Sequence, residues 1–151
     1  ELIVDKVSAA NEFIKNKGKK TAVTLYCSDS PHKDMIGLTE NNIPSTLSDS
    51  VDYCFVSYYG DDNGGYSPKW KSIFKKLANI FPSAYLGIGE CGNTAQNATE
   101  KSKVEMAKKY YGMPKFHKRF VGGYFWWNWV EDCIPSKNNK LYETINKYGF
   151  D

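Results

Sequence analysis

Four short apolar segments alternate with helical patterns along this chain, and the alternation limits its fold more than any other feature. The segments are rich in β-branched and aromatic residues, as strands are, and they cover residues 21–27, 51–59, 84–90 and 121–129. The connections between them are long enough for helices, so neighbouring strands should run parallel through right-handed crossovers. The sequence therefore predicts an α/β fold, a parallel (βα)4 unit.

Helical periods fill most of the remaining chain. Apolar residues recur every three or four positions in four segments, residues 2–17, 70–80, 97–111 and 139–148. A further short helix is expected at 43–47, whereas the polar stretches 28–42 and 60–65 are expected to be loops. No linker or low-complexity segment interrupts this order, so residues 1–151 should form a single domain.

The charge balance argues against nucleic acid as a partner. The 151 residues carry 20 basic and 17 acidic side chains, a net charge of +3, without a basic block. No apolar run approaches the ~20 residues that a membrane-spanning helix requires, so no membrane contact is expected. Glu1 opens the chain without an initiator methionine or a signal-peptide pattern, which favours a processed or fragment start.

Neither a metal nor an organic cofactor is expected. The cysteines are widely spaced and form no C-x-x-C pair, and His32 and His117 are the two histidines of the chain. Asp61, Asp62 and Asn63 resemble calcium ligands in composition but lack the alternating spacing of a calcium loop. Free thiols are favoured over disulfides for the four cysteines, Cys27, Cys54, Cys91 and Cys133.

Glu90 is the strongest candidate for a catalytic residue. It follows a short apolar strand within Gly87-Ile88-Gly89-Glu90-Cys91-Gly92, and Gly92-Asn93 is expected to turn the chain directly beyond it. The carboxyl ends of strands are where α/β enzymes place their catalytic groups, and the small neighbouring residues leave room for a substrate.

Two architectures combine parallel strands with intervening helices, an open doubly wound sheet and a (βα)8 barrel. An open nucleotide-binding sheet would carry a glycine-rich turn after its first strand, whereas the sequence there is Cys27-Ser28-Asp29-Ser30-Pro31. A carboxylate, tyrosines and tryptophans instead gather at the ends of the strands, as they do in barrel active sites. We therefore expect part of a (βα)8 barrel.

Three of the strand segments resemble those of a known family. Val56-Ser57-Tyr58-Tyr59, then Gly87 to Gly92, then Gly122-Gly123-Tyr124-Phe125-Trp126-Trp127-Asn128-Trp129 look like strands six, seven and eight of a clan A, cellulase-like glycoside hydrolase. The resemblance implies that the chain is the C-terminal half of a TIM barrel. It also implies a retaining glycosidase that acts on a β-linked polysaccharide or oligosaccharide, and hence an extracellular or secreted protein.

The same resemblance assigns roles to single residues. It implies that Glu90 is the nucleophile, that Tyr58 or Tyr59 supports it, and that Trp126 or Trp127 forms the floor of a sugar subsite. Because side chains alternate along a strand, Trp126 and Asn128 should share one face while Trp127 and Trp129 share the other. Which of the two faces binds the substrate is left open, and Asn128 is retained as a substrate-binding candidate.

One catalytic residue is missing from this assignment. A retaining glycosidase uses two carboxyl groups about 5 Å apart, and the resemblance implies that the acid/base glutamate follows strand four, outside this chain. Asn11-Glu12 imitates that motif but lies within a helical pattern, so solvated helix positions are expected. The unit should therefore pair with a missing N-terminal half-barrel or with a second copy of itself. The alternative is a non-catalytic carbohydrate-binding or structural half-barrel.

Overall fold

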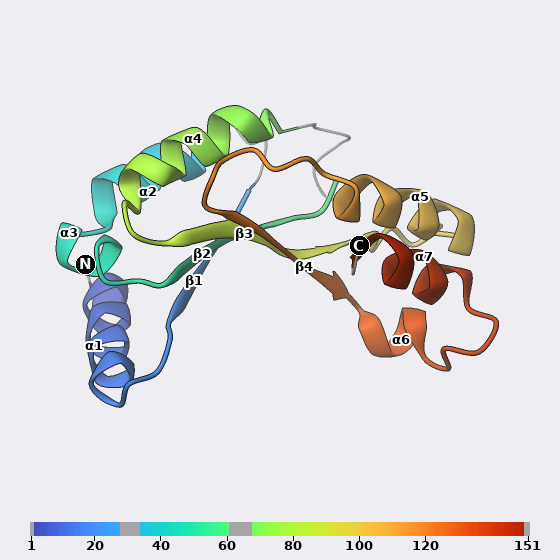
Figure 1. Cartoon of the computed structure of the whole chain (residues 1–151), viewed down its shortest axis with the longest axis horizontal. Coiled ribbons are helices and arrows are strands. Elements are labelled where there is room, and N and C mark those ends of the chain that lie inside the picture. The colour runs from blue at the N-terminus through green and yellow to red at the C-terminus, as the bar shows by residue number, and fades with distance from the viewer. Residues whose placement is uncertain (1, 28–33, 61–67, 150–151) are drawn as a thin grey trace.

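The computed structural model describes residues 2–27, 34–60 and 68–149. Helices and strands alternate along the chain, as Figure 1 shows. In order, the elements are α1 (Leu2–Asn16), β1 (Ala22–Tyr26), α2 (Met35–Asn42), α3 (Ser45–Ser48), β2 (Tyr53–Tyr58), α4 (Trp70–Ile80), β3 (Tyr85–Gly92), α5 (Glu100–Tyr111), β4 (Phe120–Trp127), α6 (Trp129–Cys133) and α7 (Lys140–Gly149).

The four strands form one parallel sheet in the order of the sequence, β1-β2-β3-β4. Sequential order with every pair parallel is the arrangement that successive βα units of one hand generate. The predicted α/β fold with four parallel strands is thus confirmed.

One face of the sheet carries the hydrophobic core. Helices α2 and α4 lie side by side over this face, and α5 packs beside α7 farther along it (Figure 1). Phe74 and Leu77 of α4 are fully buried, as are Leu86 and Ile88 of β3. Burial of each such side chain contributes about 1.5–3 kcal/mol, so this face holds the domain together.

The opposite face of the sheet has no comparable helical layer in the described part of the chain (Figure 1). Tyr53 stacks on Phe55 with ring centroids 5.8 Å apart, and Phe55 meets Phe125 edge to face at 5.7 Å. Phe125 nevertheless leaves 57% of its surface exposed. We call this side, which carries Tyr26, Tyr53, Phe55, Tyr59, Tyr85, Phe125 and Trp127, the open face.

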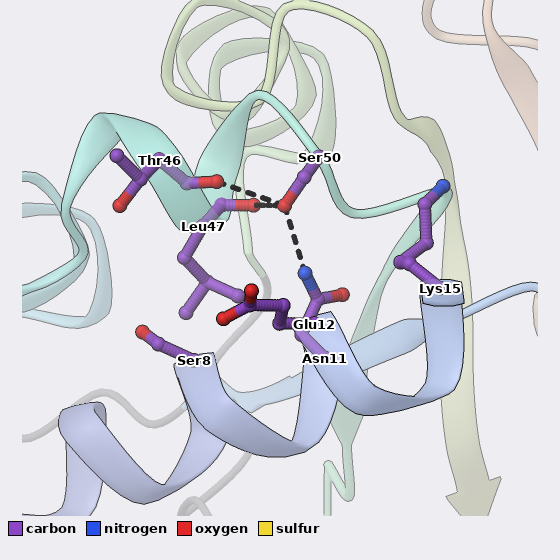
Figure 2. Close-up of a pocket in the computed structure, with 7 residues that line it drawn as sticks. All are labelled: Ser8, Asn11, Glu12, Lys15, Thr46, Leu47 and Ser50. Atoms are coloured by element: carbon purple, nitrogen blue, oxygen red, sulfur yellow. Dashed lines mark hydrogen bonds between the residues drawn. The ribbon is translucent and has the colours of Figure 1, made fainter. Parts of the chain in front are cut away.

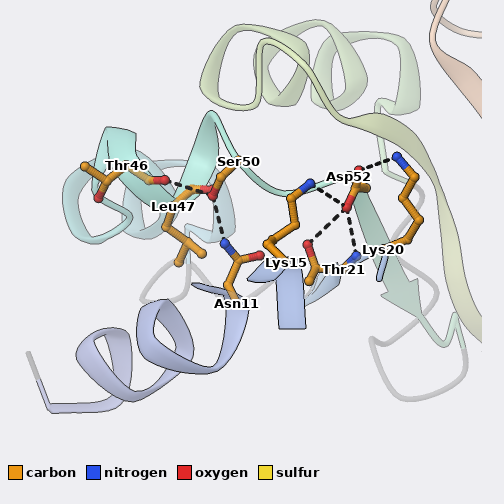
Figure 3. A network of polar contacts seen from close by, with 8 residues as sticks. All are labelled: Asn11, Lys15, Lys20, Thr21, Thr46, Leu47, Ser50 and Asp52. Atoms are coloured by element: carbon orange, nitrogen blue, oxygen red, sulfur yellow. Dashed lines mark hydrogen bonds and ion pairs between the residues drawn. The ribbon is translucent and has the colours of Figure 1, made fainter. Parts of the chain in front are cut away.

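Helix α1 is held by polar contacts. The amide nitrogen of Asn11 donates to Ser50 Oγ at 2.8 Å, and Lys15 Nζ donates to Asp52 at 3.0 Å. Asp52 also accepts from Lys20 Nζ at 2.8 Å and from the backbone N–H of Thr21 at 2.9 Å (Figure 3). These contacts attach the helix to the segment that enters β2.

The apolar side of α1, in contrast, is exposed. Ile3, Val7, Phe13 and Ile14 all reach solvent, Ile3 with 78% of its surface. The predicted helix is present, but Asn11 was wrongly expected to be solvated: it is buried, because it faces Ser50. Its neighbour Glu12 is exposed, as predicted.

Three element predictions need correction. The third strand does not end at residue 90 but continues to Gly92, so Glu90 lies within it. The stretch expected to be a loop up to residue 42 contains α2, in which Ile36 and Thr39 alone are buried, so it has no apolar stripe to signal a helix. The last strand ends at Trp127 rather than continuing to Trp129, because Asn128 accepts from the N–H of Val130 and starts α6. Several predictions concern residues outside the described ranges. These are the predictions for Glu1, for the loop residues 28–33, which include His32, and for the loop residues 61–67, which include the calcium-like residues 61–63.

Candidate active site

A bulge in β3 turns Glu90 toward the open face. Val56 pairs with Ile88 and Tyr58 pairs with Cys91, so β3 has one more residue than β2 between these pairs. In a regular strand Glu90 would share the buried face of Ile88, but the extra residue resets the alternation. Glu90 is consequently exposed, and it lies beside Phe125 of the open face.

Ser57 supports this bulge. It is the single residue of β2 opposite the bulge, and its Oγ accepts the backbone N–H of Glu90 at 2.9 Å. The neighbouring Gly89 must remain small, because a Cβ there would lie 2.7 Å from Ser57 Oγ. The backbone that presents Glu90 is thus fixed by a polar contact and by close packing.

Tyr59 holds the carboxylate of Glu90. Its hydroxyl donates to Glu90 Oε2 at 3.0 Å, and its ring stacks on Tyr26 with centroids 6.3 Å apart. Burial, and then the hydrogen bond to Glu90, raise the pKa of the Tyr59 phenol, so it remains a protonated donor at neutral pH. Within the described chain, Glu90 Oε1 makes no side-chain hydrogen bond and can approach a ligand.

Tyr58 lies on the other face of β2. Its ring is fully buried and meets Trp70 edge to face at 5.5 Å and Tyr110 at 6.4 Å. Of the two tyrosines named from the sequence, the structure brings Tyr59 to Glu90 and places Tyr58 in the core.

The two tryptophans of β4 are separated in the same way. Trp126 is 6% exposed, and its indole N–H donates to Asp132 at 2.8 Å on the covered side. Trp127 is 51% exposed and pairs with Gly92, two residues beyond Glu90. Trp127 is therefore the tryptophan that a ligand at Glu90 can reach.

An irregular stretch of β4 determines these directions. Gly122, Gly123 and Tyr124 have φ values of 88°, 100° and 67°, and β4 has an extra residue opposite β3 at this point. A Cβ on Gly123 would collide with the backbone oxygen of Ile88, which explains the glycine. Tyr124 is tied to the covered side, since its carbonyl accepts from the Tyr111 hydroxyl at 2.7 Å.

Asn128 lies at the edge of the site. Its side-chain oxygen accepts the N–H of Val130 at 3.2 Å and so begins α6, and its peptide bond with Trp127 is cis. The amide nitrogen of Asn128 is the part of this side chain that could donate to a ligand.

The four strands supply a single carboxylate. Glu90 is the acidic residue of β1 to β4, whose sequences are AVTLY, YCFVSY, YLGIGECG and FVGGYFWW. Over the described residues no group of three or more metal-binding side chains assembles, and no helix is long and apolar enough to cross a membrane. The strands themselves can therefore position one nucleophile or base, Glu90.

Sequence reasoning missed two residues of this site. Tyr26 is the last residue of β1, half exposed on the open face, and Ser57 supports the Glu90 bulge. Each lies within the last three residues of a predicted strand. Inspecting every strand end for polar and aromatic residues would therefore have found them.

A pocket of about 280 Å³ lies at the opposite edge of the molecule, between α1 and α3 (Figure 2). The side-chain oxygen of Asn11 is buried there without a hydrogen-bond partner among the described residues. Asp52 and Thr21, at the amino ends of strands, lie next to this region (Figure 3). It is thus at the end of the sheet where barrel enzymes place stabilising residues rather than chemistry. Its lining residues are Ser8, Asn11, Glu12, Lys15, Thr46, Leu47 and Ser50.

No protein-family model and no curated protein sequence matches the chain. Among solved structures, the fold is similar to that of a GH128 (subgroup I) endo-β-1,3-glucanase from Amycolatopsis mediterranei, with a TM-score of 0.60 and 12% sequence identity. The similarity covers 97% of this chain, which spans 65% of the length of the glucanase chain. That enzyme is a TIM barrel, so the four strands and their helices share the fold of a large part of such a barrel.

Proposed function

We propose that this chain is the C-terminal half of a retaining glycoside hydrolase barrel, with Glu90 as its nucleophile. The observation that carries the proposal is the hydrogen bond of 3.0 Å from the Tyr59 hydroxyl to Glu90, on the open face near the carboxyl end of β3. The similarity in fold to an endo-β-1,3-glucanase supports it. A β-linked polysaccharide or oligosaccharide is the proposed substrate, and a polymer of this kind favours a secreted protein.

Each residue of the site has a defined task in this mechanism. Glu90 Oε1 attacks the anomeric carbon, the bond to the leaving oxygen breaks, and a glycosyl ester forms on the enzyme. Tyr59 donates to Oε2 and so orients the carboxylate. A second carboxyl group, outside this chain, protonates the leaving oxygen and later removes a proton from the water that hydrolyses the ester.

The open face indicates where that second group would come from. A preceding half-barrel would pair with the edge strands β1 and β4 and cover the exposed aromatic side chains of the open face, except Tyr26 and Trp127 at the carboxyl ends of β1 and β4. A second copy of this chain is the other proposed partner, but it would supply no carboxylate beyond its own Glu90 from the strands. The preceding half-barrel is therefore the partner that completes the chemistry.

The proposal is tested by replacing Glu90 in the protein completed by this half-barrel. Glu90→Gln should reduce hydrolysis of β-1,3-glucan, measured as new reducing ends, by about a thousandfold or more, because the amide cannot form the ester. Glu143→Gln, the same change at an exposed position of α7, is the control and should leave the rate unchanged.

A chemical rescue separates a nucleophile from a residue that only binds sugar. Glu90→Gly leaves space in which azide can attack an activated aryl glycoside, and the product should be a glycosyl azide of inverted configuration. Full activity of Glu90→Gln would refute the assignment. Sugar binding without any hydrolysis by the completed protein would instead support a non-catalytic carbohydrate-binding barrel.

A further inference from the structure

The aromatic rings near Glu90 extend beyond its own strand. Tyr26 ends β1, Tyr59 follows β2, and Trp127 ends β4, on the far side of Glu90 in β3. Neighbouring strands are about 4.8 Å apart, so the row from Tyr26 to Trp127 crosses three intervals and about 14 Å. That span is longer than a single sugar ring.

Tyr26 has the properties of a ligand platform. One side of its ring stacks on Tyr59, at a centroid distance of 6.3 Å and an interplanar angle of 25°. Half of its surface is nevertheless exposed, although the ring belongs to a structured strand paired with β2. A planar, fixed and half-exposed ring presents the apolar face that sugars prefer, at a low cost in side-chain entropy.

We propose that Tyr26 stacks against a sugar unit of the substrate, away from the unit that reacts at Glu90. This inference rests on the proposed glycosidase function and deepens it. The substrate is then an oligosaccharide or polysaccharide that lies across the strand ends from Trp127, past Glu90, to Tyr26. Short glycosides that occupy only the position at Glu90 do not reach Tyr26.

The chain contains a matched control for this proposal. Tyr85 has the same residue type, the same 50% exposure and the same open face as Tyr26. It is the first residue of β3, however, and its ring contacts Tyr53 at 5.8 Å at the amino end of the sheet. A general effect of removing an exposed tyrosine would appear at both positions, whereas loss of a sugar contact would appear only at Tyr26.

The experiment measures binding of β-1,3-linked glucose oligomers by calorimetry in the completed protein, with Glu90→Gln present to prevent turnover. Tyr26→Ala should weaken binding of the hexasaccharide by about tenfold, the loss expected for one aromatic contact, and leave the disaccharide unaffected. Tyr26→Phe and Tyr85→Ala should bind both oligomers as the parent does. Thermal unfolding verifies that each variant is folded.

Two results would overturn the inference, and they differ in what they mean for the proposed function. Equal hexasaccharide binding by Tyr26→Ala and its parent removes Tyr26 from the site but leaves Glu90 as the nucleophile. If the completed protein binds neither oligomer and Glu90→Gln hydrolyses substrate at the parent rate, both the Tyr26 contact and the role of Glu90 as nucleophile are refuted. If the parent binds the hexasaccharide more tightly than the disaccharide, and Tyr26→Ala loses this difference in affinity, the inference is supported.

Discussion

The two faces of the sheet are built from similar apolar residues but differ in how well those residues are covered. On the covered face, Leu86 and Ile88 are fully buried under the helices, whereas Phe125 and Trp127 on the open face remain about half exposed. The residue types alone do not account for the difference, because aromatic rings occur on both faces. A contiguous set of exposed aromatic side chains is typical of a surface that binds a partner or a ligand.

The helices show the same contrast. Helix α4 buries its apolar side, including Trp70, Phe74 and Leu77, against the sheet. Helix α1 exposes its apolar side and is attached through Asn11 and Lys15. Because α1 leads into the edge strand β1, a strand placed beside β1 would contact this helix and the open face together. The comparison therefore favours the proposal that another half-barrel covers both.

Replacing one phenylalanine on each face tests how much each face contributes to the free energy of unfolding. Phe74→Ala should lower the free energy of unfolding by about 3–5 kcal/mol, since it leaves a cavity in the core. Phe125→Ala should lower it by less than about 1 kcal/mol, because that ring is mostly solvated and makes one edge contact with Phe55. Urea unfolding of the chain, with the m-value compared between variants, provides both numbers.

The comparison becomes sharper in the completed protein. There the preceding half-barrel should bury Phe125, and the cost of Phe125→Ala should approach that of Phe74→Ala. A cost that stays below about 1 kcal/mol in the completed protein would show that nothing packs on the open face.

The irregular part of β4 offers a second test, with a smaller expected effect. Gly123→Ala should destabilise the chain by about 2–4 kcal/mol, because φ is 100° and the new Cβ would meet the Ile88 carbonyl. Gly18→Ala is the control, since φ is 68° there but no atom lies within 4 Å of the added carbon. It should cost about 1 kcal/mol, and thermal unfolding compares the two. Equal costs would argue that the close approach of β3 and β4 does not fix the faces of β4.

The fold could be predicted from the sequence where burial produces a clear period. The strand ending at Tyr58 is a nearly continuous apolar run, and α4 repeats its apolar residues at helical spacing, so both were identified. Helix α2 was missed because it buries only two residues and has no such stripe. The helical period of α1 was visible, but a period cannot reveal whether the rest of the chain covers the apolar side of the helix.

The site could be predicted only to within pairs of residues. Glu90 could be chosen as a candidate because it is the carboxylate of an otherwise apolar, glycine-lined strand. The choice between Tyr58 and Tyr59, and between Trp126 and Trp127, depends on which face each residue takes. A bulge in β3 and three positive φ values in β4 set those faces, and neither changes the pattern of residue types in a recognisable way.

The smallest expected effect on stability concerns Asp52, whose contacts attach α1 to the sheet. The hydrogen bond from Lys20, the backbone N–H of Thr21 and the ammonium of Lys15 hold the pKa of the Asp52 carboxyl well below its usual range. Its folded pKa thus lies below the unfolded value of about 3.9, and the stability gained is present above that pH and lost as pH falls below it. Asp52→Asn should lower the unfolding free energy by about 1 kcal/mol at neutral pH, a small value because Lys20 is largely exposed.

Two measurements distinguish this local effect from a general change of charge. The difference in stability between the parent and Asp52→Asn should shrink toward zero below about pH 4. Asp49→Asn, the same change at an exposed position, is the control for the loss of one charge. Amide exchange should accelerate in α1 and not in α4, because apolar burial rather than Asp52 anchors α4. If exchange rose equally in both helices, the polar contacts of Asp52 would be stabilising the whole sheet. The idea that polar contacts attach α1 while apolar burial attaches α4 would then be wrong.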